Sequence, residues 1–120
     1  MAWKFSNEQS VFVQIANKLR IDIANGKYLP DSKIPSVRHL ALEAAVNPNT
    51  MQKALLLLED EGLLQSRGTV GRFITADTSV ISRTRENMRT NAVRKLLAEV
   101  HKIGITADEL IECIKKEEDL

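Results

Sequence analysis

The 120-residue sequence is poor in cysteine and in long apolar runs, and each shortage excludes a class of protein. Its single cysteine, Cys113, can form neither an internal disulfide nor a zinc site, so nothing requires an oxidising compartment. Its neighbours Ile111 and Ile114 predict a half-buried thiol. The longest apolar run, residues 54–58, is too short to span a membrane, and the first residues lack a signal-peptide core. We therefore expect a cytoplasmic protein with no membrane association.

An excess of charge of one sign is also lacking, because 17 Lys and Arg face 16 Asp and Glu, a formal net charge of +1. Any attraction to a polyanion must therefore come from where the charges lie. Catalytic and metal-binding groupings are missing as well. His39 and His101 have no Cys or His at ligand spacing, and there is no Ser-His-Asp set or phosphate-binding loop. We expect no enzyme activity, no metal and no cofactor.

What the sequence does contain is a series of helical patterns. Apolar residues at helical spacing predict a first helix over residues 10–25. Ser36 suits the N-cap of a short second helix, and Asn47 followed by Pro48 suits the start of a third that stops at Gly62. The third helix has one apolar face, made of Met51, Ala54, Leu55 and Leu58. The expected core comprises Phe12, Ile15, Leu19, Leu40, Val46, Leu55, Leu58 and Phe73.

Residues 63–67 and 72–75 are predicted to be the strands of a β-hairpin. Three helices followed by a hairpin are typical of a winged helix-turn-helix domain, which we assign to residues 1–76. Residues 77–120 show two more helical patterns, the second beginning with a capping box at Thr106. The sequence thus predicts a mainly α fold with a small β-hairpin, in which the winged helix is followed by a short two-helix C-terminal dimerisation region.

Both helices of this tail carry aliphatic stripes that are too wide for one neighbouring helix to cover. Burial of such surface contributes roughly 25 cal/mol per Å², which favours association with a second copy of the chain. The residues expected in this homodimer interface are Val93, Leu96, Leu97, Val100, Leu110, Ile111 and Ile114. Two helices are too little to enclose an effector pocket within one chain, although a pocket shared across a dimer stays open.

Four spaced motifs, residues 35–41, 46–50, 58–63 and 71–74, carry a resemblance over about residues 8–75. They resemble the GntR family of bacterial transcription regulators, and the Asn-Pro-Asn-Thr turn and short tail resemble its YtrA subfamily in particular. The resemblance implies a dimeric winged-helix protein that binds DNA, usually as a repressor. It also implies a short helical C-terminal piece in place of an effector-binding domain.

The resemblance extends to individual positions. Arg38 matches the family arginine near the start of the second helix, which contacts DNA backbone and bases. The N-terminus of the third helix matches the recognition helix, and its short polar side chains suit base edges and phosphates. Arg67 and Arg72 keep the hairpin basic. The predicted DNA-binding residues are Arg38, Asn47, Asn49, Thr50, Gln52, Lys53, Arg67, Thr69 and Arg72.

Three positions depart from the family pattern. Ala45 stands where glycine is usual between the second and third helices, and a left-handed conformation there costs roughly 1 kcal/mol. Gln52 replaces an arginine of many relatives, which removes a phosphate or guanine contact. Thr69 stands where the first glycine of the wing is expected, and Gly68 comes one residue early. These departures concern the turn, one DNA contact and the wing tip.

Two functions follow from this pattern. The favoured one is a sequence-specific transcriptional regulator, a repressor that binds a palindromic double-stranded DNA operator as a homodimer. The alternative is a winged-helix protein-interaction module without specific DNA binding, in which Leu56, Leu57 and the tail dock a partner protein. The basic residues around one edge favour DNA, because an interaction module has no need for them.

Overall fold

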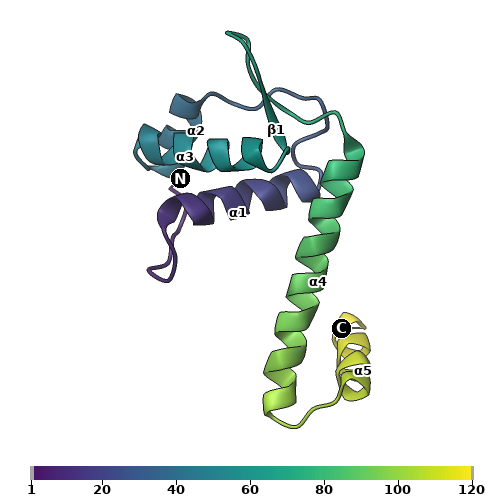
Figure 1. The fold of residues 1–120 in the computed structure, drawn as a ribbon. Helices are drawn as coiled ribbons and strands as arrows, with labels where there is room; N and C mark the ends of the chain where they lie inside the picture. The colour runs from purple at the N-terminus through teal and green to yellow at the C-terminus, as the bar shows by residue number, and fades with distance from the viewer. Residues whose placement is uncertain (1, 120) are drawn as a thin grey trace. The chain divides into compact units, whose positions relative to one another are not determined.

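The structure is a computed structural model that describes residues 2–119, and within them it has five α-helices and one antiparallel two-stranded sheet (Figure 1). The helices are α1 (Val11–Ala24), α2 (Val37–Ala44), α3 (Pro48–Asp60), α4 (Thr78–Lys102) and α5 (Ala107–Glu118). The strands are β1 (Leu64–Arg67) and β2 (Gly71–Ile74). Residue contacts divide the chain into two units, Met1–Arg85 and Glu86–Leu120. The prediction of a mainly α fold with a small hairpin is confirmed.

Side-chain caps fix where three of the helices begin. Ser36 and Thr106 each accept a hydrogen bond from the backbone N–H three residues further on, at 3.2 Å in both cases. Asn47 Oδ1 accepts the N–H of Asn49 at 2.7 Å, and Pro48 occupies the first turn of α3, where a missing N–H costs nothing. The sequence-based starts of α2, α3 and α5 are therefore confirmed.

The core of the first unit lies between α1, α2, α3 and one face of the hairpin. The residues of α3 that are buried are the four predicted from its apolar face, Met51, Ala54, Leu55 and Leu58. The predicted core residues that are fully buried are Ile15, Leu19, Leu40, Leu55 and Leu58, whereas Phe12, Val46 and Phe73 are partly exposed. In β2 it is Ile74 that is buried, because neighbouring side chains of a strand point to opposite faces.

The hairpin pairs Leu64 with Ile74 at its base and Arg67 with Gly71 at its tip. Lys33 forms an isolated bridge with Phe73, so the connection before α2 also joins the sheet edge. The Lys33 side chain crosses Gly71 so closely that a Cβ at this glycine would lie 2.9 Å from Lys33 Cε. A side chain at position 71 would therefore have to displace Lys33.

The turn between α2 and α3 has a left-handed residue that is not glycine. Ala45 has φ 58° and ψ 48°, and its N–H donates to the carbonyl of Leu42 at 3.2 Å. The next N–H, that of Val46, donates to the carbonyl of Ala41 at 3.0 Å, which completes a Schellman motif. The same pair of bonds ends α3, where the left-handed residue is Gly62 with φ 81°. The turn therefore keeps the usual geometry at the cost of strain at Ala45.

We expect Ala45→Gly to stabilise the protein by about 0.5–1 kcal/mol, because glycine removes the left-handed strain. The greater conformational freedom of glycine in the unfolded chain offsets part of this gain. The midpoint of thermal unfolding would rise by about 2–6 °C. Gly62→Ala is the matched control, since it introduces at the end of α3 the strain that Ala45→Gly removes, and it is expected to lower the midpoint. An unchanged or lower midpoint for Ala45→Gly would contradict the strain argument.

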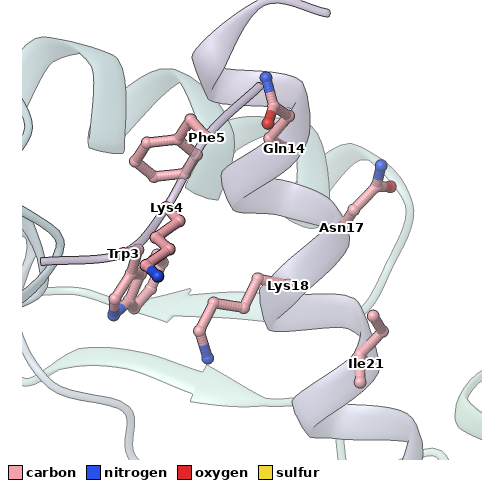
Figure 2. Close-up of a pocket in the computed structure, with 7 residues that line it drawn as sticks. All are labelled: Trp3, Lys4, Phe5, Gln14, Asn17, Lys18 and Ile21. Atoms are coloured by element: carbon pink, nitrogen blue, oxygen red, sulfur yellow. The ribbon is translucent and has the colours of Figure 1, made fainter. Parts of the chain in front are cut away.

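The residues before α1 lie along the outer face of this helix (Figure 2). The Gln14 side chain ties them down, since Oε1 accepts the N–H of Ser6 at 2.8 Å and Nε2 donates to the Ser6 carbonyl at 2.9 Å. The Lys18 ammonium lies 4.6 Å from the ring centroid of Trp3. These contacts hold Trp3 and Phe5 beside α1 and leave a shallow hollow of about 370 Å³.

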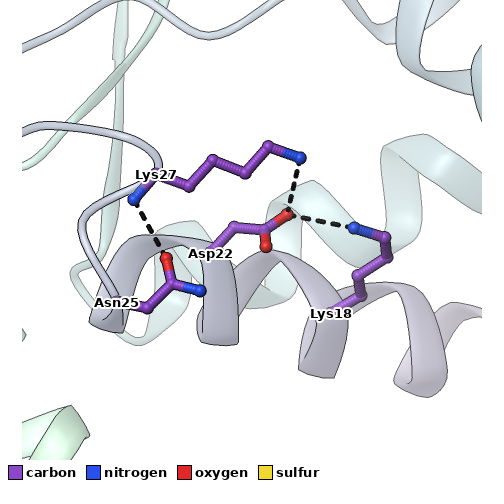
Figure 3. A network of polar contacts seen from close by, with 4 residues as sticks. All are labelled: Lys18, Asp22, Asn25 and Lys27. Atoms are coloured by element: carbon purple, nitrogen blue, oxygen red, sulfur yellow. Dashed lines mark hydrogen bonds and ion pairs between the residues drawn. The ribbon is translucent and has the colours of Figure 1, made fainter.

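One carboxylate on α1, that of Asp22, is largely buried and carries two lysine partners (Figure 3). Its Oδ2 lies 3.1 Å from Lys18 Nζ and 3.6 Å from Lys27 Nζ. Asn25 Oδ1 accepts the backbone N–H of Lys27 at 2.9 Å and shapes the turn that brings this lysine back. These ion pairs hold the chain where it leaves α1. They also mean that Lys18 and Lys27 are paired within the protein.

The first turn of α4 packs on the core of the first unit through Val80 and Ile81. Asp77 precedes this helix and accepts hydrogen bonds from Ser79, which hold the pKa of the Asp77 carboxyl below its usual value. The sequence places the domain boundary at Ala76, whereas residue contacts divide the chain after Arg85. The difference arises because the start of α4 contributes apolar contacts to the first unit.

No residue of α4 or α5 is fully buried in the described chain. Val93 is 51% exposed and Ile111 is 48% exposed, so the aliphatic stripes of the tail are open to solvent in a single chain. Cys113 is exposed too, and the prediction of a half-buried thiol is wrong for the single chain, because no neighbouring element covers this part of α5. Among residues 2–119 no helix is both long and apolar enough to cross a bilayer.

Candidate nucleic-acid interface

The start of α3 presents short polar side chains. Asn49 is exposed and Thr50 is partly exposed, and neither side chain has a hydrogen-bond partner within residues 2–119. Asn47 differs, because its oxygen is engaged in capping the helix. The backbone N–H groups of the first turn are already paired, since Asn49 donates to Asn47 Oδ1 and both Thr50 and Met51 donate to the Asn47 carbonyl. Asn49 and Thr50 are therefore the side chains at this end that are available to a ligand.

Two further cations lie on α2 and α3. Arg38, in the first turn of α2, is exposed and has no ion-pair partner in the described part of the chain. Lys53 lies one turn along α3, and its ammonium is 4.8 Å from the ring centroid of Phe12. This contact orients Lys53 without neutralising it. Both positive charges are thus free to meet a phosphate.

The hairpin contributes its own cation and a polar tip. Arg67 pairs with Asp31, and its guanidinium carbon lies 4.1 Å from the ring centroid of Phe73. Thr69 is exposed between the strands. Arg67 is therefore held on the outer face of the hairpin, where its charge is partly balanced by Asp31.

A hollow of about 330 Å³ lies between the start of α2, α3 and the hairpin, and it brings distant parts of the sequence together. Its lining residues are Pro35, Ser36, Val37, Gln52, Ser66, Gly68, Gly71 and Arg72. A second hollow of about 610 Å³, lined in part by Lys33, Thr69 and Val70, lies beside the hairpin tip. The predicted residues Gln52, Thr69 and Arg72 therefore surround two hollows that share the loop before α2.

Arg72 is the predicted DNA-binding residue with the most protein contacts. Its Nε donates to Glu59 Oε1 at 2.8 Å, and its Nη1 donates to Gln52 Oε1 at 3.1 Å. Ser66 also donates to Glu59 Oε1. Partial burial raises the pKa of Glu59, but the hydrogen bonds from Ser66 and Arg72 and the charge of Arg72 outweigh it and hold this pKa below its usual value. Glu59 thus stays ionised and fixes Arg72.

Sequence reasoning did not single out Glu59. It lies 13 residues from Arg72 along the chain, and its role depends on how the hairpin folds back onto α3. Helical periodicity identifies the apolar face of α3, but it does not show that the carboxylate of Glu59 meets the basic hairpin. The hollow of Figure 2, by contrast, is lined by none of the predicted DNA-binding residues. Within residues 2–119 no grouping of side chains fits a metal ion.

Comparison with known proteins agrees with the winged-helix geometry. The model of the family described as bacterial regulatory proteins, gntR family, matches residues 12–74, which is more than half of the chain. The chain belongs to the GntR family. It is therefore a transcriptional regulator with a winged helix-turn-helix domain and not an enzyme, as predicted.

This GntR regulator is similar along most of its length to smaller members of the family. It is 31% identical over 108 residues to the HTH-type transcriptional repressor YtrA of Bacillus subtilis, covering 88% of this chain and 82% of that one. A GntR family transcriptional regulator from Listeria monocytogenes superposes with a TM-score of 0.88 at 28% identity, covering 93% and 98% of the two chains. The prediction of a YtrA-like GntR protein is confirmed.

A further structural relative of this GntR regulator is bound to DNA. The structure of AraR(DBD) in complex with operator ORX1 superposes with a TM-score of 0.54 at 31% identity. It covers 60% of this chain and 93% of the AraR chain. The likeness is therefore to the winged-helix part, and it concerns the region that contains the candidate interface.

Proposed function

We propose that this GntR regulator acts in the cytoplasm as a repressor that binds a palindromic operator as a homodimer. The observation that carries the proposal is that the first unit exposes Arg38, Asn49 and Lys53 without ion-pair or side-chain hydrogen-bond partners among the described residues. The same unit has two hollows beside the hairpin, lined in part by Gln52, Thr69 and Arg72. The first unit thus combines unneutralised cations with unpaired polar side chains. The similarity to YtrA, which is named a transcriptional repressor, and to AraR(DBD), whose structure is in complex with an operator, supports this proposal.

In the proposed complex, α3 enters the major groove with its N-terminus foremost. The side chains of Asn49 and Thr50 then meet base edges. Arg38 and Lys53 carry unneutralised charge and contact the sugar–phosphate backbone. Arg67 and Thr69 of the hairpin contact the sugar–phosphate backbone of the DNA beside the groove. In this arrangement α3 recognises the bases, and the basic residues position the protein on the DNA.

The proposed homodimer uses the tail. Its seven predicted interface residues are exposed or partly exposed, and none of them is fully buried within residues 2–119. A second copy buries these aliphatic stripes with a favourable free energy. Because a two-fold dimer presents two identical reading heads, its preferred DNA site is a palindrome.

The proposal is tested by replacing one residue of each type. We expect Arg38→Ala and Asn49→Ala each to weaken specific binding by about 1–3 kcal/mol, or roughly 5–150-fold, because each loses a contact in or beside the groove. Thermal stability is expected to stay unchanged, since both side chains are exposed and unpaired. The measurement is a titration of labelled duplex DNA from upstream of the protein's own gene.

Lys102→Ala serves as a control for loss of one positive charge, because this residue lies at the end of α4. It is expected to bind the same duplex as the unaltered protein does. Full binding by both Arg38→Ala and Asn49→Ala would place the docking surface elsewhere. Absence of sequence preference in the unaltered protein, together with capture of a protein partner through Leu56 and Leu57, would favour the interaction module instead.

A further inference from the structure

Arg72 lies between a carboxylate and an amide of α3, and this position determines which atom of Gln52 is left free. Its Nη1 donates to Gln52 Oε1 at 3.1 Å while its Nε donates to Glu59 Oε1 at 2.8 Å. A guanidinium has only donors, so the amide atom that faces it has to be the oxygen. The donor atom Nε2 of Gln52 is therefore the arm of the amide that remains for a ligand.

Glu59 prevents Arg72 from turning freely toward a phosphate. The side chains of Arg72 and Glu59 are only 15% and 22% exposed, and Ser66 donates to the same carboxylate oxygen. Breaking a partly buried pair leaves an uncompensated charge, which is strongly unfavourable. Arg72 thus differs from Arg38, which is exposed and has no partner among the described residues.

We propose that Arg72 is a positioning residue that makes Gln52 prefer a keto base, guanine or thymine, at one position of each half-site. This inference rests on the proposed function. A free glutamine pairs with adenine through both its oxygen and its nitrogen, but here the oxygen is engaged by Arg72. In the major groove guanine O6 and thymine O4 accept a hydrogen bond, whereas adenine N6 and cytosine N4 donate one. Adenine N7 also accepts a hydrogen bond, but its neighbouring N6 donor is then left without the Gln52 oxygen, which Arg72 engages. Cytosine offers the donor no acceptor, so the keto bases complement it best.

The place of Gln52 in the fold agrees with this role. It lies three residues after Asn49 on α3 and lines the hollow between α2, α3 and the hairpin. The hairpin therefore influences base reading without touching a base, because β2 supplies the residue that orients a side chain of α3. The feature that distinguishes this role from a phosphate contact is that it changes base preference and not only affinity.

The experiment begins with selection of binding sites from randomised duplex DNA by the full-length protein. Titration of the selected site with each of the four bases at every position then identifies the position at which Gln52→Ala becomes indifferent. There the unaltered protein is expected to favour keto over amino bases by about 5–20-fold. Gln52→Glu keeps an oxygen for Arg72 and replaces the donor by an acceptor, so it is expected to reverse the preference toward cytosine or adenine.

Arg72→Met is the direct test, and Arg67→Met is its matched control. Both remove one positive charge from the hairpin, but only Arg72 contacts Gln52. Arg72→Met is expected to reduce the keto preference to below about 3-fold and to admit adenine, because both amide atoms become free. Arg67→Met is expected to weaken binding to all four sequences equally. Thermal unfolding shows that each variant is folded at the temperature of the titration.

Two results would overturn the proposal. In one, Arg72→Met keeps the keto preference and loses affinity uniformly, as a phosphate contact does. In the other, Gln52→Glu keeps the preference of the unaltered protein, which means that its amide does not read the base. Failure of the unaltered protein to select any sequence is a different outcome, since it rejects the proposed function itself and this inference with it.

Discussion

A protein shortened to end at Arg85 is expected to be a folded monomer that binds operator DNA about 10²–10⁴-fold more weakly than the full chain. The first unit has its own buried core, including the contacts of Val80 and Ile81, so it keeps its structure without the rest of the tail. Two linked heads make the second contact with a palindrome intramolecular, and this gain is lost in a monomer. Light scattering gives the mass, circular dichroism the fold and titration the affinity.

Substitutions in the full chain separate loss of the dimer from loss of the tail. Leu96→Glu and Ile111→Glu place a charge on the exposed aliphatic stripes and are expected to give monomers, whereas Asn91→Glu, at an exposed polar position of α4, is not. A shortened protein that still sediments as a dimer would contradict the proposed interface. The contact would then lie in the first unit, at Leu56 and Leu57 or at the segment from Trp3 to Phe5.

Salt is expected to weaken operator binding about 10³–10⁴-fold between 50 and 200 mM, although the chain as a whole has a net charge of only +1. The steep dependence follows if a dimer neutralises roughly 6–8 phosphates, each of which releases condensed counterions. Titrations at four or five salt concentrations give the slope of log K against log salt. Its expected value is about −5 to −7.

Arg38→Ala supplies the internal check on this slope. Each dimer loses two phosphate contacts, so the slope is expected to become shallower by about 2. A substitution that removes a charge already paired within the protein, such as Lys27→Ala beside Asp22, is expected to leave the slope unchanged. A flat salt dependence for the unaltered protein would argue for the protein-interaction module.

Local features of the fold were predictable from the sequence because they depend on neighbouring residues. The caps at Ser36, Asn47 and Thr106 each bond to a backbone group two or three residues away, so their chemistry is visible in a short window. The buried face of α3 follows from its helical period. Phe73 shows the limit of such reasoning. Strand alternation defines two faces without saying which is inward, and it is Ile74 that faces the core.

Contacts between distant residues were not predictable in the same way. The pairing of Arg72 with Glu59 and Gln52 requires the hairpin to fold back on α3, across 13 and 20 residues of sequence. The division of contacts after Arg85 was not predictable for a related reason. The helical pattern of α4 is continuous, so nothing in the sequence marks Arg85 as the place where contacts with the core end. The assignment of individual DNA contacts stays a prediction.

The exposed thiol of Cys113 has a practical consequence for studying the tail. It is the single cysteine of the chain, so a maleimide dye attaches at one defined point on α5 without any engineered site. Two such dyes, a donor on one copy and an acceptor on the other, transfer energy only while the copies are together. Subunit exchange is thereby observable in real time, in the presence or absence of DNA, with the native sequence of the reading head intact.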